Sequence, residues 1–307
     1  MQRILEPDRN ECEFDGLAAR FWGVRGSFSI CGREYEKFGG NTPCVEIRMG
    51  RRLFIVDAGT GLAVLGRQIS DHVPKNVDIL LSHLHLDHIG GLLMCKHLLL
   101  DEKRTIRTFC GNLDGASAKA ALDKLFSPPL FPITLDMVPA NFEHRGFRAG
   151  EPLTFEDGII IRTTPLDHPG GATGYRFDHD GRAICYLSDL EHSGVWPDPA
   201  LVAFCEGADM VIFDGMFCMS DYCNHAGWGH STWMKGVELC RAANVTSLAV
   251  FHHNPCYDDD RLEEMEHQLQ QEMPTAFIAR ERHFVHFAGR NTVKTAGLPS
   301  SFNHAVA

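Results

Sequence analysis

The stretch SHLHLDH, residues 82–88, decides the fold class of this chain. It directly follows a largely apolar run, at the position where a buried strand would end. Side chains two residues apart on an extended segment project to the same side, so His83 and His85 can bind one metal ion. Asp87 and His88 lie beyond the bend and can reach a second ion. Imidazole nitrogen and carboxylate oxygen suit Zn²⁺, Mn²⁺ or Fe, so the motif predicts a site for two metal ions rather than a solvated polar loop.

Length and composition predict one large α/β domain. The chain has 307 residues, of which 44% are hydrophobic, so it can bury a sizeable core. We expect a single domain over residues 1–290 and a loose tail over residues 291–307. No uncharged apolar run reaches about 18 residues, so we expect no contact with a membrane.

The cysteines and the N-terminal residues indicate a cytoplasmic protein. The eleven cysteines include no C-x-x-C pair and are scattered through apolar contexts, which fits buried reduced thiols better than disulfides. Residues 1–10 carry charges and lack an apolar stretch of signal-peptide length.

The charge balance bears on the substrate. A formal net charge of -11 argues against binding of long nucleic acids, because proteins that bind them usually gather Lys and Arg on one face. Two divalent cations would still concentrate positive charge at the site itself. We therefore expect a small anionic substrate.

Apolar runs and turn residues predict strands and helices in both halves of the chain. In the first half we expect strands at 19–24, 44–49, 52–57 and 77–82, with helices after Gly61 and over 89–99 and 116–126. In the second half we expect strands at 158–164, 172–177, 183–187, 210–213 and 247–251, with helices over 231–243 and 259–272. Two strand-rich halves, each followed by helices, predict two sheets packed face to face with helices outside.

Further candidate ligands follow strands in the second half. His168, Asp189 and the pair His252 and His253 each come just after an expected strand. Each alone is weak, since a strand-end histidine is commonly a hydrogen-bonded loop residue and an aspartate commonly a turn former. Their shared position, beside an independently strong motif, favours metal binding.

These residues, taken in order, resemble the metallo-β-lactamase superfamily. The resemblance implies a four-layer αββα sandwich of class α/β, with two mixed β-sheets and a site for two metals at one sheet edge. Within the superfamily the chain is similar to the ribonuclease Z and cyclic phosphodiesterase branch, and residues 230–252 to the diesterases that open phosphoribosyl cyclic phosphate. The landmarks are FWGVRGS at 21–27, GGNT at 39–42, DAGTG at 57–61 and GHST at 229–232.

The resemblance also implies the ligand set. His83, His85 and His168 would hold one metal, and Asp87, His88 and His252 the other, with Asp189 bridging the two. His253 is the rival of His252, which we prefer because the family places its ligand three residues before a proline, here Pro255. We expect zinc, with manganese or iron as alternatives, and a homodimer.

His230 decides the substrate class. In the phosphodiesterase branch the corresponding histidine faces the substrate phosphate and can protonate the leaving oxygen. The competing interpretation is a residue at a helix N-terminus, with Ser231 as the cap. Asp214 is a candidate to orient a ligand histidine, whereas for Cys218 and Cys223 we expect free buried thiols.

The predicted function is therefore metal-dependent hydrolysis of a small phosphodiester, including cyclic ones. A hydroxide between the two metals would attack phosphorus, with Asp87 holding it and accepting its proton. Hydrolysis of a carboxylic ester, lactone or thioester is the alternative. A non-catalytic metal sensor is less favoured. So is tRNA 3′ processing, because residues 105–150 show no Gly-rich basic arm of the kind that clamps tRNA in this branch.

Overall fold

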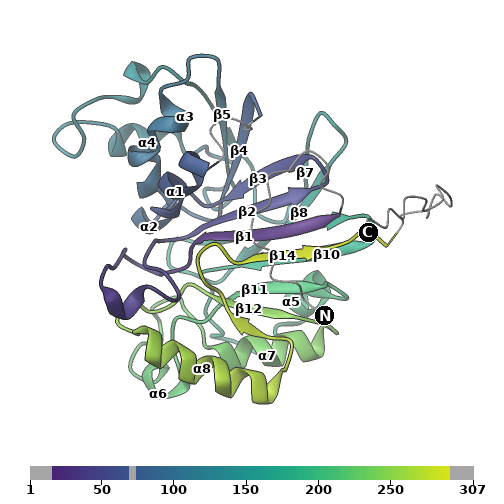
Figure 1. The fold of residues 1–307 in the computed structure, drawn as a ribbon. Helices are drawn as coiled ribbons and strands as arrows, with labels where there is room; N and C mark the ends of the chain where they lie inside the picture. The colour runs from purple at the N-terminus through teal and green to yellow at the C-terminus, as the bar shows by residue number, and fades with distance from the viewer. Residues whose placement is uncertain (1–15, 69–73, 291–307) are drawn as a thin grey trace, which may run out of the picture.

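Two seven-stranded β-sheets pack face to face in the computed structural model, which describes residues 16–68 and 74–290 (Figure 1). The predicted tail over 291–307 and the charged residues 1–10 lie outside the described residues. The first sheet has the order β14 (Phe284–Phe287), β1 (Leu17–Gly23), β2 (Cys44–Met49), β3 (Arg52–Val56), β4 (Asn76–Leu81), β5 (Thr105–Cys110) and β6 (Asn141–Gly146). The second has the order β13 (Phe277–Ile278), β12 (Leu248–Phe251), β11 (Met210–Asp214), β10 (Arg182–Leu187), β9 (Ala172–His179), β8 (Ile160–Leu166) and β7 (Leu153–Thr154).

Both sheets are mixed. In the first sheet, the pairs β14–β1, β1–β2 and β2–β3 are antiparallel, and the pairs β3–β4, β4–β5 and β5–β6 are parallel. In the second, β7 to β10 are antiparallel and β10 to β13 parallel. The parallel strands of each sheet bring their carboxyl ends to one edge, where the following loops meet.

Strands buried on both faces form the middle of the molecule. In β3, Phe54 and Val56 belong to the core between the two sheets, whereas Leu53 and Ile55 pack under the helices of the first sheet. This alternation follows from the two-residue period of a strand. It explains why β3 reads as a continuous apolar run.

Helices form the two outer layers. The first sheet is covered by α1 (Gly61–Gln68), α3 (Lys96–Leu99) and α4 (Lys119–Leu125), and the second by α5 (Pro199–Cys205), α7 (Trp233–Ala242) and α8 (Asp259–Glu272). The short elements α2 (Leu86–Ile89) and α6 (Met219–Tyr222) and the 3-10 turns at 33–35, 90–94 and 135–137 complete the order. Figure 1 shows the helices on the outside of the paired sheets, so the predicted αββα sandwich is confirmed.

The predicted helix over residues 89–99 was wrong as a continuous element. It is divided into α2, a 3-10 turn at 90–94 and α3. Gly91 packs so closely that a Cβ there would lie 1.8 Å from the carbonyl oxygen of Gly59. The apolar content was read correctly, but this close approach of two backbones was not visible in it.

Two strands were missed between residues 105 and 150, where the only element we expected was the helix over 116–126. β5 pairs with β4, and β6 forms the edge of the first sheet. β6 reads NFEHRG and is only partly buried, so it lacks the apolar alternation that marks a strand. The expected helix at 116–126 is present as the shorter α4.

The thiols agree with the prediction except at the surface. All ten cysteines within the described residues are free, and seven of them are buried. Cys218 is buried as expected, whereas Cys223 is exposed, so the prediction of a buried thiol was wrong there. Within residues 16–68 and 74–290, no helix combines the length and the apolar character needed to cross a membrane.

Candidate metal centre

The site is assembled at the ends of strands from both sheets. His83 follows β4 in the first sheet, while His168, Asp189 and His252 follow β8, β10 and β12 in the second. Asp189 and His252 adopt the left-handed backbone conformation, with φ of 63° and 60°. Such conformations cost about 1–3 kcal/mol for a non-glycine residue and persist where surrounding structure enforces them, commonly at functional sites.

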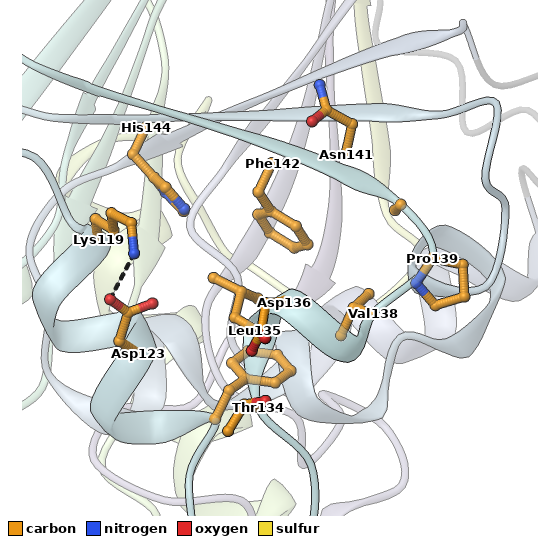
Figure 2. Close-up of a pocket in the computed structure, with 12 residues that line it drawn as sticks. Lys119, Asp123, Thr134, Leu135, Asp136, Val138, Pro139, Asn141, Phe142 and His144 are labelled. Atoms are coloured by element: carbon orange, nitrogen blue, oxygen red, sulfur yellow. Dashed lines mark hydrogen bonds and ion pairs between the residues drawn. The ribbon is translucent and has the colours of Figure 1, made fainter.

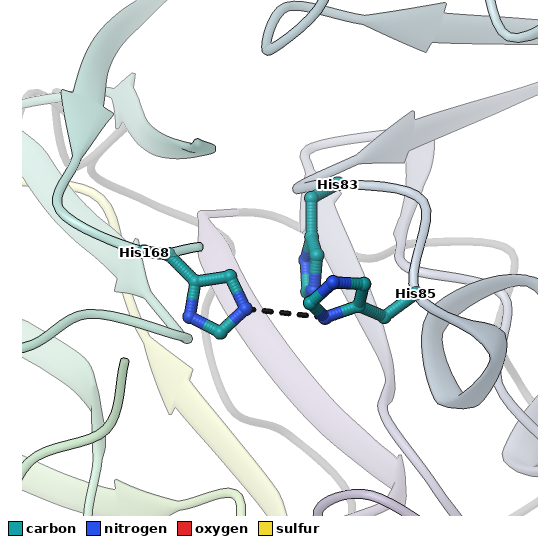
Figure 3. A group of neighbouring side chains, drawn as sticks. All are labelled: His83, His85 and His168. Carbon is teal, nitrogen blue, oxygen red and sulfur yellow. Dashed lines mark hydrogen bonds between the residues drawn. The ribbon is translucent and has the colours of Figure 1, made fainter. Parts of the chain in front are cut away.

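His83, His85 and His168 form the first group of candidate ligands (Figure 3). The His85 Nδ1 and His168 Nε2 atoms lie 3.2 Å apart. The His83 Nε2 atom is buried and has no hydrogen-bond partner. A buried polar atom normally has a partner, and a metal ion would be a suitable one for this nitrogen. His85 is exposed and opens this side of the group to solvent.

Asp87, His88 and His252 form the second group, and all three are buried. The Nε2 atoms of His88 and His252 are 3.3 Å apart, and Asp87 Oδ2 lies 3.4 Å from the first and 3.3 Å from the second. Donor atoms about 2.0–2.1 Å from a tetrahedral zinc ion are about 3.3–3.4 Å from one another. The spacing in this group is therefore that of ligands around one ion.

Asp189 lies between the two groups. Its Oδ2 atom is 3.2 Å from His88 Nε2, and its Oδ1 atom is 3.3 Å from His252 Nε2. The Oδ1 atom is also 3.9 Å from the Nε2 atoms of His83 and His168. One carboxylate thus faces donors of both groups, as a bridging ligand would.

A buried network behind the ligands fixes His88. Asp57 is fully buried, and its Oδ2 atom accepts hydrogen bonds from His88 Nδ1 at 2.8 Å, Ser82 Oγ at 2.9 Å and the Tyr186 hydroxyl at 2.6 Å. Donation from Nδ1 leaves the Nε2 lone pair of His88 pointing into the site. From the sequence, Asp57 was recognised only as part of the DAGTG landmark, although its position directly after an apolar strand could have indicated this role.

His230 lies against both groups of ligands. Its ring stacks on His252 with centroids 4.9 Å apart and meets His168 edge-on at 5.4 Å. Its Nδ1 atom donates to Asp214 Oδ2 at 2.8 Å. Burial opposes protonation, yet the charge and hydrogen bond of Asp214 raise the pKa of His230 to about 9.

The structure separates the two rival histidines. His253 is fully buried outside the ligand groups, where its Nε2 atom donates to the Ala279 carbonyl at 2.7 Å. Burial and the nearby Arg25 lower its pKa to about 3, so it remains neutral. His252 is the member of the pair that faces Asp87 and Asp189.

The donor set fits divalent metal ions. Burial lowers the pKa of His83 well below its usual range and also lowers that of His168, which keeps both imidazoles in the neutral form that binds metal. Burial opposes the charge on Asp189, but the neighbouring His252, His88 and His83 hold the pKa of its carboxyl well below normal. A buried, charged carboxylate needs a cation beside it. Burial opposes protonation of His88, but the carboxylates of Asp189, Asp87 and Asp57 raise its pKa well above the usual range, so in the metal-free protein a proton on His88 supplies positive charge that a metal ion would replace.

A cavity of about 660 Å³ lies elsewhere, between α4 and β6 (Figure 2). Its lining includes Phe126, Leu135 and Phe142, with Lys119 and His144 near its rim. None of the candidate ligands lines it. The chemistry of the molecule is therefore concentrated at the strand ends rather than in this cavity.

The fold and the buried His/Asp groups together define a metal-dependent hydrolase. Residues 52–253 match a family model described as the Beta-lactamase superfamily domain. The chain therefore belongs to the metallo-β-lactamase superfamily, as its motifs predicted.

The chain is similar to curated proteins named ribonuclease Z. Ribonuclease Z of Treponema pallidum is 25% identical over 293 residues, which cover 80% of this chain and 92% of that protein. Ribonuclease Z of Brevibacillus brevis is 25% identical over 146 residues, and this match covers only 46% of this chain and 42% of that protein.

Solved structures of other proteins share the fold of this chain. A structure described as a new diphosphatase from the PhnP family aligns with a TM-score of 0.64 at 17% identity, covering 88% of this chain and 98% of that chain. Zn²⁺-bound PqqB from Methylobacterium extorquens aligns with a TM-score of 0.65 at 12% identity, covering 88% and 100%. Such low identities show the fold alone, and the fold they share is the one that the family model indicates.

Proposed function

We propose that the protein is a phosphodiesterase that hydrolyses small phosphodiesters, including cyclic ones, with two divalent metal ions. Zinc is the expected metal, with manganese and iron as alternatives. The observation that carries the proposal is the placement of His230, whose ring contacts His168 of one ligand group and His252 of the other. The diphosphatase and ribonuclease names of the neighbouring proteins support attack at phosphorus.

In this proposal the ligands are His83, His85, His168, Asp87, His88 and His252, with Asp189 between the two ions. With both ions bound, the site would lower the pKa of a water molecule and so provide a hydroxide near neutral pH.

Two side chains then carry the proton chemistry. Asp87 Oδ2 is held by the Ser27 backbone N–H at 2.8 Å and lies between His88 and His252, where it can hold the attacking water and accept its proton. His230 has its Nδ1 atom engaged by Asp214, so Nε2 is the nitrogen that can donate a proton to the leaving oxygen.

The test is an assay of the zinc- or manganese-loaded protein on bis(p-nitrophenyl) phosphate and on nucleoside cyclic phosphates. Replacement His230→Ala should retain the bound metal but lower turnover by roughly 10²- to 10⁴-fold, because a general acid is lost. His267→Ala is the matched control, since His267 lies exposed on α8. Absence of turnover by fully loaded wild-type protein, or turnover of lactones and acyl-thioesters instead, would refute the diesterase proposal.

Precursor tRNA is the competing substrate, because the curated relatives are named ribonuclease Z. The net charge of -11 disfavours a long polyanion. Residues 105–146 form β5, α4 and β6 within the sandwich, rather than a protruding basic arm. Cleavage of a precursor tRNA faster than the small diesters would favour the processing function.

We also propose a homodimer, on the resemblance to this branch alone. Analytical ultracentrifugation of the metal-loaded protein tests it. A single species at the mass of one chain, 34.2 kDa, would contradict the dimer.

A further inference from the structure

Four aromatic rings contact one another in series, from the candidate metal centre to the surface. The ring of Phe217 meets His230 edge-on, with centroids 6.2 Å apart, and stacks on His225 at 4.6 Å. His225 in turn meets the indole of Trp228 edge-on at 4.8 Å. Phe217 is 1% exposed, whereas Trp228 is 60% exposed. The buried ring of Phe217, beside the site, therefore supports the exposed indole of Trp228 through His225.

The loop that carries this indole is fastened to the site by Glu191. The carboxylate accepts hydrogen bonds from the Gly227 N–H at 2.6 Å, the Gly229 N–H at 2.9 Å and the Tyr222 hydroxyl at 2.8 Å. These bonds to backbone and hydroxyl donors, against the opposing effect of burial, lower the pKa of Glu191. The residues on either side of Trp228 are thus held in place.

The loop is also joined directly to a candidate ligand. The Gly229 carbonyl accepts a hydrogen bond from His168 Nδ1 at 2.8 Å. A Cβ at Gly229 would lie 2.2 Å from Pro169 Cδ, and its φ of +84° suits glycine. The peptide that follows Trp228 therefore packs onto the His168 loop without room for a side chain.

An exposed indole in a fixed position is a preorganised contact surface. Exposed Trp side chains contribute large contact area at low conformational cost, and aromatic faces stack on planar rings without regard to their hydrogen-bonding pattern. Trp228 is two residues from His230, so their Cα atoms are at most about 7 Å apart. The indole therefore extends from a backbone position next to the histidine that contacts both ligand groups.

We propose that Trp228 is a specificity-determining residue that stacks on the base of a small nucleoside phosphodiester. This inference rests on the proposed phosphodiesterase function and names the class of its substrate. Phe28 and Leu86 are also exposed, at 54% and 66%. Phe28 follows Ser27, whose N–H contacts Asp87, and Leu86 directly precedes Asp87, so further apolar surface lies close to this candidate ligand along the chain. The indole supplies affinity for the base and takes no part in proton transfer.

The experiment compares two cyclic phosphodiesters on the zinc-loaded protein. Adenosine 2′,3′-cyclic phosphate carries a base, and glycerol 1,2-cyclic phosphate does not. For Trp228→Ala we expect kcat/KM to fall roughly 5- to 100-fold on the adenosine substrate, mainly through KM, because one base–aromatic stack is lost. The base-free substrate should be hydrolysed at the wild-type rate, and Trp228→Phe should retain most of the selectivity.

Leu130→Ala is the matched control, since Leu130 is 73% exposed in a loop that carries no candidate site residue. Equal losses on both substrates would assign Trp228 to loop structure and overturn the proposal. So would equal kcat/KM values of the wild type on the two substrates.

A binding measurement separates this inference from the proposed function. Calorimetric titration should show adenosine 3′-monophosphate binding the zinc-loaded wild type roughly 5- to 100-fold more tightly than ribose 5-phosphate, with the difference lost in Trp228→Ala. If no diester is hydrolysed but this difference is present, the function fails and the stacking site stands. If the two ligands bind equally, the stacking site fails whatever the activity.

Discussion

Replacement of Asp57 by asparagine should weaken metal binding without touching a ligand. The carboxylate is fully buried and accepts four hydrogen bonds, from the Ser82 N–H, the Ser82 hydroxyl, His88 Nδ1 and the Tyr186 hydroxyl. If the amide oxygen stays on the Ser82 N–H, the NH₂ group takes the place of Oδ2. The two hydroxyls can turn and accept from this NH₂, but His88 Nδ1–H cannot. His88 therefore either loses its partner or shifts its proton to Nε2, the atom that faces the site.

The magnitudes follow from that one bond. A hydrogen bond to a charged acceptor contributes about 1.5–3 kcal/mol, so the free energy of unfolding of the metal-free protein should fall by about that amount. Loss of the partner that orients a ligand histidine typically costs about 10- to 100-fold in metal affinity. Urea denaturation measures the first effect, and competition for zinc with a chromogenic chelator measures the second.

Asp78→Asn is the control. Asp78 is a buried carboxylate in the same sheet, and it accepts from Arg107 Nε at 2.5 Å and Nη2 at 2.8 Å rather than from a histidine. Its replacement should also lower stability, because a buried ion pair is broken, but it should leave zinc affinity unchanged. Wild-type zinc affinity in Asp57→Asn, or an equal loss in both variants, would refute the orientation argument.

Three further predictions follow from the site. Gly26→Ala should lower zinc affinity, because the new Cβ would lie 2.4 Å from the ring of His252. The control Gly194→Ala should not lower zinc affinity, since nothing lies within 4 Å of the new Cβ. A normal zinc affinity in Gly26→Ala would show that the His252 ring can move. Glu191→Ala should lower kcat, because the loop that Glu191 holds would no longer keep the Gly229 carbonyl on His168. Glu191→Gln should retain part of the rate. Unchanged kinetics in both variants would show that Glu191 does not position this loop. Zinc should stabilise the metal-free protein by about 2.7 kcal/mol at 100 times Kd, as measured by thermal unfolding, and an unchanged midpoint would mean that the groups bind no zinc.

The parts of the site predicted from sequence were those encoded by short stretches. Residues 82–88 are recognisable as a metal motif from the sequence alone, because four candidate ligands lie close together just after a strand. His168, Asp189 and His252 were found because each comes just after an expected strand, and because their order resembles the ligand order of the superfamily. The structure brings all of these side chains together at adjoining strand ends.

The parts that were missed depend on contacts between distant segments. Asp57 reaches His88 and Tyr186 across 31 and 129 residues of chain, and no local pattern marks those partners. The same holds for Glu191, whose partners lie in the loop before His230. The missed strand β6 is a half-exposed edge, so it carries no apolar period.

The pairing of β14 with β1 has a consequence for synthesis of the protein. Leu17 lies opposite Phe287 and Arg20 opposite Phe284. Within residues 16–68 and 74–290, the first strand to be synthesised therefore pairs on its outer edge with the last. At about 5–20 residues per second, the ribosome takes roughly 10–50 s to reach that segment. Throughout this interval one edge of β1 remains open to pairing with other chains. A nascent chain arrested before residue 284 should therefore depend on chaperones far more than the finished protein does.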